Sequence, residues 1–124
     1  MSYARRLTVA VTTNGSGDAT AYSDPIEHGL LSQIRYVKGD FDNGSTFAIT
    51  CEATGETLWG ETGVNASATR APRQATHSTA GAAALYAGGG SAVNDKIAIA
   101  KDRIKIVISS GGAAKSGTFH FLLT

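Results

Sequence analysis

Ile104-Lys105-Ile106-Val107-Ile108, near the end of the chain, places an isoleucine at every second position. Thr118-Phe119-His120-Phe121-Leu122-Leu123 repeats this pattern with Phe119, Phe121 and Leu123. Side chains two residues apart lie on the same face of a β-strand, so each run predicts a half-buried strand. We expect the two runs to pair as a hairpin across residues 110–117, with the six apolar side chains shielded from water together.

The same period of two recurs upstream. Val9 and Val11 share one face of residues 7–12, and Phe47, Ile49 and Cys51 line up in the same way. Residues 14–18 read Asn-Gly-Ser-Gly-Asp, which are turn residues, so we expect residues 19–23 to return as the hairpin partner of residues 7–12. Between residues 30 and 38, the face with Leu30, Ser32, Ile34 and Tyr36 is the more apolar one.

These alternating runs predict an all-β fold: an antiparallel, jelly-roll-like β-sandwich with one long loop excursion. An open barrel is the alternative. The length of 124 residues indicates one domain, 1–124, with an N-terminal arm at residues 1–6 and a long loop at residues 64–93. The predicted core consists of Val9, Val11, Ile34, Phe47, Ile49, Ile104, Ile106, Ile108, Phe119, Phe121 and Leu123.

Composition excludes several classes of protein. The chain is 42% hydrophobic and 17% charged, which is typical of neither a disordered nor a membrane protein. Its 11 basic and 10 acidic residues give a net charge of +1, far below the excess expected of a protein that binds nucleic acid. We read no signal peptide and no membrane anchor in the sequence, so assembly in a cytoplasm is expected.

The chemical motifs are weak, and we expect no enzyme activity, cofactor or metal. Residues 40–44 resemble the front of a calcium loop, but Cys51 stands where the twelfth ligand, a glutamate, would be required. Residues 88–91 lack the lysine of a phosphate loop. The three histidines are too far apart in sequence for a metal pair. Cys51 is predicted to be a small buried hydrophobe.

The long loop is the candidate contact region, because loops of this length in a compact domain usually carry function or assembly contacts. Arg70 and Arg73 flank Pro72 and could form a small basic patch. A solvated loop without a partner is the alternative. Trp59 is expected to be a core or interface anchor; as the alternative, it could stack with Tyr36 or Tyr86 as a carbohydrate platform.

Several stretches resemble a family of small proteins encoded by tailed bacteriophages and prophages. They include Asn65-Ala66-Ser67-Ala68-Thr69, residues 79–83, Asp102-Arg103-Ile104-Lys105-Ile106, and the glycine-rich connector from Gly111 to Gly117. The similarity extends over most of the chain and includes residues 12–17 and 34–37. Members of this family are similar to virion structural proteins, above all capsid decoration (cement) proteins.

The resemblance implies a partner, a location and an oligomeric state. The partner would be the major capsid protein, bound on the capsid exterior of a virion that assembles in the bacterial host cytoplasm, without contact to nucleic acid or membrane. A homo-oligomer is expected, with a trimer favoured over a dimer. The contact residues would be Tyr3, Arg5, Arg6, Arg70, Arg73, His77, Leu85 and Tyr86. The alternatives are a head-tail joining or tail component, and a module that binds carbohydrate or a host surface.

Overall fold

The computed structural model describes residues 4–124, which contain strands and no helix. Each main strand alternates buried and exposed side chains, as the sequence pattern requires. The strands are β1 (Arg5–Thr12), β2 (Ala19–Tyr22), β3 (Ile26–Lys38), β4 (Ser45–Cys51), β5 (Thr57–Val64), β6 (Ala68–Arg70), β7 (Gln74–Ala75), β8 (Asn94–Asp95), β9 (Ile97–Asp102), β10 (Ile104–Ser109) and β11 (Ser116–Leu123).

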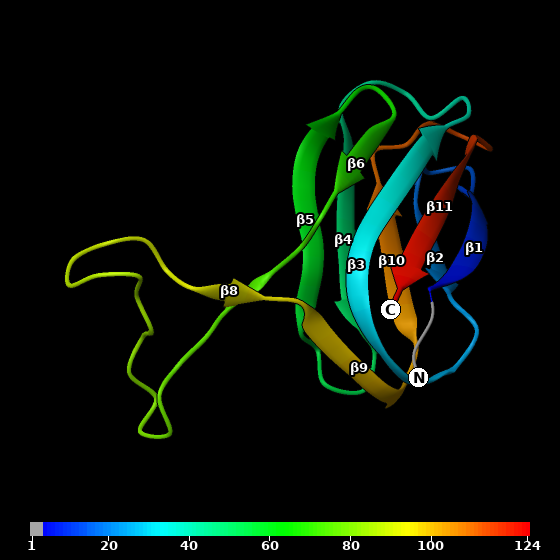
Figure 1. The fold of residues 1–124 in the computed structure, drawn as a ribbon. Helices are drawn as coiled ribbons and strands as arrows, with labels where there is room; N and C mark the ends of the chain where they lie inside the picture. Colours follow the sequence, from blue (N-terminus) through cyan, green and yellow to red (C-terminus); the bar gives the residue numbers. More distant parts are fainter. Residues whose placement is uncertain (1–3) are drawn as a thin grey trace.

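Two antiparallel sheets pack face to face (Figure 1). Sheet A has the order β1-β11-β3-β6, with β9 also paired to β3, and sheet B has the order β2-β10-β4-β5. The short strands β7 and β8 pair with each other in an arm outside the sandwich. The prediction of an all-β, antiparallel sandwich is confirmed.

Strands β6 and β9 lie end to end along one edge of β3. Strand β6 pairs with the segment from Ile34 to Tyr36, and β9 pairs with the segment from Ile26 to Leu31. Leu31 pairs with β9 on this edge and with β11 on the opposite edge. Strands β6 and β9 are therefore two halves of one strand position, which residues 71–96 interrupt.

Merging β6 and β9 reveals the topology of the sandwich. Each sheet then has four strand positions, and the chain crosses between the sheets at every connection except the one from β4 to β5. Numbered along the chain, the merged strands follow the orders 1-8-3-6 and 2-7-4-5. This is the arrangement of a double-sheet jelly roll, in which two Greek keys close over one core.

Both predicted hairpins are wrong. Strand β1 pairs with β11, and β2 pairs with β10 in the other sheet. Strands β10 and β11 likewise belong to different sheets, although their inward side chains share one core. Alternation shows which side chains share a face but leaves the pairing partner open, and in this topology consecutive strands face each other across the core.

Parts of the predicted N-terminal arm and of the predicted long loop belong to strands of the sandwich. Arg5 and Arg6 belong to β1 and pair with Leu123 and Leu122, whereas Tyr3 lies outside the described residues. Val64 ends β5, and β6 returns to sheet A. The excursion is therefore residues 71–96, a loop that the short pair β7–β8 and two isolated bridges hold together.

A β-bulge in β3 changes which leucine enters the core. Leu31 is fully buried and Leu30 is 40% exposed, the reverse of the predicted face. Leu122 pairs with Gln33 and Leu123 with Leu31, so Ser32 is the extra residue. One inserted residue shifts the alternation by one position, which turns Leu31 inward and Leu30 outward.

The eleven predicted core residues are all buried, from Val9 at 9% exposure to eight that are fully enclosed. Aromatic rings fill the middle of the sandwich. Tyr36, Phe47 and Phe119 lie with their ring centroids 4.8 to 5.1 Å apart, and Trp59 packs edge-on against Phe47 at 5.3 Å. The interior is thus filled with side chains from both sheets.

Tyr36 provides a test of this packing, because its hydroxyl is buried without a hydrogen-bond partner among the described residues. We expect Tyr36→Phe to raise the free energy of unfolding by about 1 kcal/mol, since it removes an unpaired polar group. Burial raises the pKa of the Tyr36 phenol from 10.0 to about 12. The wild type should therefore lose stability relative to Tyr36→Phe as the pH rises from 10.0 towards 12, because the unfolded phenol ionises first. Urea unfolding of wild type and Tyr36→Phe at neutral pH, at pH 10.0 and towards pH 12 measures both effects. A Tyr36→Phe variant that is less stable than wild type at neutral pH would contradict the prediction.

The interrupted strand provides a second test. Deleting residues 72–95 joins Ala71 to Lys96. These two residues then connect Arg70, which pairs with Ile34, to Ile97, which pairs with Leu31. We expect this variant to fold, with a melting temperature within about 5 °C of wild type, because no side chain from residue 73 to residue 95 is buried. Circular dichroism and thermal unfolding measure the result.

Ile106→Asp is the control for that deletion, since it places an unpaired charge where the wild-type side chain is fully buried. It should abolish cooperative unfolding. A deletion variant that behaves like Ile106→Asp would show that the arm is part of the folding unit, contrary to the interrupted-strand interpretation.

Candidate interaction surfaces

The arm of residues 71–96 projects from the edge of sheet A, well clear of the sandwich (Figure 1). Backbone hydrogen bonds hold it in shape. Thr76 N donates to Val93 O at 2.8 Å, and Ala84 N donates to Thr76 O at 2.9 Å. Isolated bridges join His77 to Ala83 and Leu85 to Ala92. The arm is therefore held together by backbone hydrogen bonds, and it has two tight turns, at residues 78–81 and 87–90.

The arm has no core of its own. From residue 73 to residue 95 only Thr76, Ala84 and Val93 are half-buried, and every other side chain is exposed. Leu85 is 41% exposed and Tyr86 is 77% exposed. A two-stranded ribbon is at best marginally stable in water. The exposed apolar side chains of the arm make it the first candidate contact surface.

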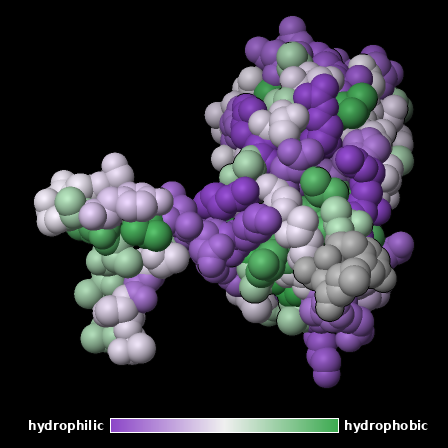
Figure 2. Space-filling model, in the orientation of Figure 1, coloured by the Kyte–Doolittle hydropathy of each residue, from purple (hydrophilic) through white to green (hydrophobic). Residues whose placement is uncertain are grey.

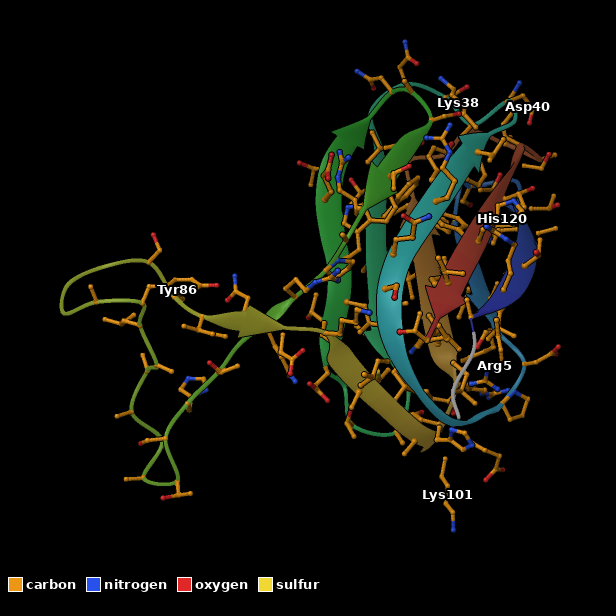
Figure 3. The ribbon with its side chains drawn as sticks, viewed as in Figure 1. Arg5, Lys38, Asp40, Tyr86, Lys101 and His120 are labelled. Carbon is orange, nitrogen blue, oxygen red and sulfur yellow. The ribbon has the colours of Figure 1, made fainter. Side chains whose placement is uncertain are left out.

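The outer part of the arm, between residues 76 and 94, carries no aspartate, glutamate, lysine or arginine, and the charged residues Arg73, Asp95 and Lys96 lie at its root. Figure 2 shows this part in pale and green colours, whereas purple groups gather at the root of the arm. Tyr86 lies on the arm, apart from the labelled residues of the sandwich (Figure 3). The arm therefore suits an apolar contact better than an electrostatic one.

The root of the arm is fixed to sheet A. Arg73 Nη1 donates to Ser32 O at 3.0 Å and to Pro72 O at 2.8 Å. Ser32 lies in β3 between the segments that pair with β6 and β9, so the guanidinium satisfies a carbonyl in the gap of the interrupted strand. Lys96 Nζ donates to Thr124 Oγ1 at 3.2 Å on the returning side. Arg73 is thus committed to the root of the arm rather than presented as a basic patch.

Arg70 is also engaged within the protein. Its Nε lies 2.9 Å from Glu61 Oε1 and its Nη2 lies 3.0 Å from Glu61 Oε2. Trp59 Nε1 donates to Glu61 Oε1 at 2.9 Å, and the Arg70 guanidinium lies 5.4 Å from the centre of the Trp59 ring. Hydrogen bonds from Arg70 and Trp59 lower the pKa of the Glu61 carboxyl. The sequence pattern missed Glu61, which lies nine residues before Arg70, on β5 of the other sheet.

The predicted contact residues therefore occupy three separate places. Arg5 and Arg6 lie on β1, where Arg5 Nη2 donates to His28 O. Arg70 and Arg73 make structural contacts at the sheet edge. His77, Leu85 and Tyr86 lie exposed on the arm. The structure does not bring these residues together into one site.

The carbohydrate platform is wrong in the form proposed from the sequence. Trp59 is 6% exposed and Tyr36 is fully buried, so neither ring offers a face to a sugar. Tyr86 belongs to the arm. The expectation that Trp59 is a core or interface anchor is confirmed in its first form, because the ring is buried against Phe47 and Phe119.

The candidate catalytic and metal-binding residues are dispersed. Cys51 is buried, and burial raises the pKa of its thiol to about 11, to which the charges of Asp102 and Glu56 contribute. His28, His77 and His120 lie on β3, on the arm and on β11. Within residues 4–124 no group of three or more histidine, cysteine, aspartate or glutamate side chains could hold a metal ion. Asp40 Oδ1 accepts a hydrogen bond from Ser116 N at 2.7 Å, which lowers the pKa of its carboxyl.

A shallow hollow lies at one end of the sandwich. Its lining includes Glu27, Lys101 and Asp102, together with the ion pair between Arg103 and Glu52. The Arg103 guanidinium also stacks over the Tyr22 ring as a cation–π contact, 3.9 Å from the ring centre. Among the described residues, Arg103 and Glu52 are the charged groups of this hollow that form an ion pair, and Asp102 Oδ1 accepts hydrogen bonds from the backbone N–H groups of Ala53 and Arg103. No helix in residues 4–124 is long and apolar enough to cross a bilayer.

Comparison with known proteins leaves the function open. No protein-family model and no curated protein matches the chain. Among solved structures, the chain is similar to one described as the crystal structure of FLHE, with 11% sequence identity, a TM-score of 0.45 and 98% of each chain covered. A likeness this weak carries no functional argument, so any proposal depends on the residues described above.

The Arg70–Glu61–Trp59 contact predicts a pH-dependent contribution to stability. Because the pKa of Glu61 is lowered from 4.5 in the folded state, its contribution is present above 4.5 and is lost as the pH falls through the lowered value. At about pH 7 we expect Glu61→Gln to cost up to about 1 kcal/mol, a modest value because the pair is partly exposed to solvent. Near pH 3 the difference from wild type should shrink.

Urea unfolding of wild type and Glu61→Gln at the two pH values measures this effect. Glu27→Gln is the matched control, since Glu27 is exposed and makes no ion pair among the described residues. Equal stability of wild type and Glu61→Gln at neutral pH would show that the contact contributes nothing.

Proposed function

We propose that this protein is a capsid decoration (cement) protein, which binds the outer surface of a tailed-phage head and stabilises contacts between major capsid subunits. The observation that carries the proposal is a filled jelly-roll sandwich bearing an ordered, coreless arm. Jelly rolls are frequent in viral capsid domains, which is support by analogy only, since one fold hosts many functions. The resemblance of the sequence to virion structural proteins supports the same role.

A cement protein needs a rigid body, because it resists the outward pressure of packaged DNA. The sandwich meets this need with an aromatic interior that joins both sheets, where Tyr36, Phe47 and Phe119 contact one another. Close-packed interiors have low compressibility and transmit strain. The filled interior therefore gives the sandwich the rigidity that the role requires.

A cement protein also needs a long reach, because it bridges neighbouring subunits. The arm extends beyond the sandwich and presents Leu85 and Tyr86 to solvent. Aromatic side chains are enriched at the buried centres of interfaces, where they supply large contact area. We assign the arm to contacts with the shell, with the uncharged segment between residues 76 and 94 as the part that packs against a neighbouring subunit.

Several copies would act together. An oligomer that holds several capsid subunits gains affinity through effective concentration, even when each contact is small. A trimer would match the local three-fold axes of a shell and a dimer would match its two-fold axes; we favour the trimer. The net charge of +1 suits a protein that lies outside the shell and does not contact DNA.

The arm assignment predicts that Leu85→Ser combined with Tyr86→Ser weakens binding to shells that lack this protein by about tenfold or more. Each substitution removes an exposed apolar side chain while leaving the sandwich untouched. Sedimentation of the variant with purified shells, over a range of concentrations, measures the affinity.

Tyr22→Ser is the control, because Tyr22 is 40% exposed but lies on sheet B instead of the arm. It should bind shells as wild type does. Unchanged binding by the double arm variant would remove the arm from the contact, and no binding by wild type would reject the cement function.

A further inference from the structure

The outward face of sheet A has a row of polar side chains across its middle. The registers place Thr8 of β1 opposite His120 of β11, His120 opposite Arg35 of β3, and Arg35 opposite Thr69 of β6. Their neighbours along each strand, such as Val9, Phe119 and Ile34, are buried, so this row points outward. Figure 3 shows His120 on β11 at this side of the sandwich.

Three basic side chains meet in this row and the next. Directly opposed residues in antiparallel strands have Cβ atoms about 5 Å apart, and diagonal neighbours lie about 7–8 Å apart. Arg35 is directly opposite His120. Arg6 pairs with Leu122, two residues from His120, and is its diagonal neighbour. We call Arg6, Arg35 and His120 the basic cluster.

The basic cluster has no carboxylate to neutralise it. Arg35 Nη1 donates to Thr69 Oγ1 at 3.1 Å, and His120 Nδ1 lies 3.3 Å from Thr8 Oγ1; both partners are uncharged. The two ion pairs of the described residues lie elsewhere, at Glu61 and Glu52. The outward residues next to the cluster are uncharged: Thr8, Ala10, Thr118, Leu122, Gln33, Val37 and Thr69. Asp102 lies at the far end of β9, where it pairs with Ile26.

Arg6 and Arg35 flank β11 from the two neighbouring strands, and their like charges repel across it without a carboxylate of the described residues to pair with either. A partner that supplies negative charge would relieve the repulsion. Arginine is suited to that contact, since its planar guanidinium forms paired hydrogen bonds with a carboxylate. The chemistry of the cluster therefore points to carboxylates on a partner.

The surroundings of the cluster favour a protein partner over nucleic acid. Leu30 and Val37 are 40% and 42% exposed on the same face, and aliphatic side chains of this kind pack against protein surfaces. Two arginines and one histidine are few for a surface that binds a phosphate backbone. Figure 2 shows hydrophilic and hydrophobic groups interspersed on this side of the sandwich, as in a protein interface.

We propose that the outward face of sheet A, centred on the basic cluster, docks onto a carboxylate-bearing protein surface of the phage shell. This inference rests on the proposed cement function, and it names the second contact beside the arm. The arm would supply the apolar contact, and sheet A would supply the charged one. Binding through the cluster should weaken as salt concentration rises, because exposed ion pairs are screened.

The test uses Arg6→Glu combined with Arg35→Glu in the full chain, with purified shells that lack this protein as the probe. We expect binding at least about tenfold weaker than wild type, and a weaker dependence on salt. Arg6→Gln combined with Arg35→Gln is the milder companion variant, which removes the charge without reversing it and should give a smaller loss in the same direction. Thermal unfolding confirms that each variant is folded.

Lys105→Glu is the matched control. Lys105 is half-buried on β10 and faces outward from sheet B, between the side chains of Tyr22 and Thr50, so it makes a charge reversal on the opposite face. We expect it to bind shells within about twofold of wild type. Similar losses for this control and for the arginine variants would show that net charge is responsible, which would overturn the inference.

The remaining outcomes separate the inference from the function it rests on. If wild type binds shells and both arginine variants bind equally well, the docking face is wrong while the cement function stands. If wild type does not bind shells at all, both fail. If wild type binds a short DNA duplex instead and the arginine variants lose that binding, the cluster recognises phosphate and the protein docking proposal is overturned.

Discussion

The contact between the inward faces of the two sheets is the constraint on which the rest of the structure depends. Isoleucines of β10 and β4 from sheet B meet the phenylalanines of β11 and Tyr36 of β3 from sheet A, and all are almost completely shielded from water. Burial of apolar side chains is the main favourable contribution to folding. Because side chains fill the space between the sheets, the side chains that can contact other molecules lie on the outward faces, on the sheet edges and on the arm. This is the form expected of a building block that acts through its surface.

The interrupted strand explains how such a block can carry a long arm. Strands β6 and β9 complete the edge of sheet A on both sides of the insertion, so the sandwich closes without using residues 71–96. Arg73 and Lys96 fix the two ends of the ribbon to sheet A. A force on the arm is therefore transmitted to the middle of a sheet edge rather than to a loose terminus. The arm and the basic cluster belong to the same sheet, which lets one side of the molecule make both proposed contacts.

The sequence predicted the inward residues but not their partners. Alternation identifies Val9, Ile106 and Phe119 as buried because a strand has a fixed period of two. It leaves open which strands pair, and so it failed for both hairpins, where consecutive strands belong to opposite sheets. The bulge at Ser32 has no signal in the sequence, and it moved Leu31 into the core in place of Leu30. The neighbour of Arg35 follows from strand register, and the contact of Arg70 with Glu61 follows from the packing of one sheet edge against the other, so both emerge only once the sheets are assembled.

A density map of intact virions tests the central claim most directly, because it places every copy of the protein relative to the shell. The cement function predicts jelly-roll density at many equivalent positions on the capsid exterior, with the arm lying over a neighbouring capsid subunit and sheet A facing the shell. Density found only at the portal vertex or in the tail would contradict it.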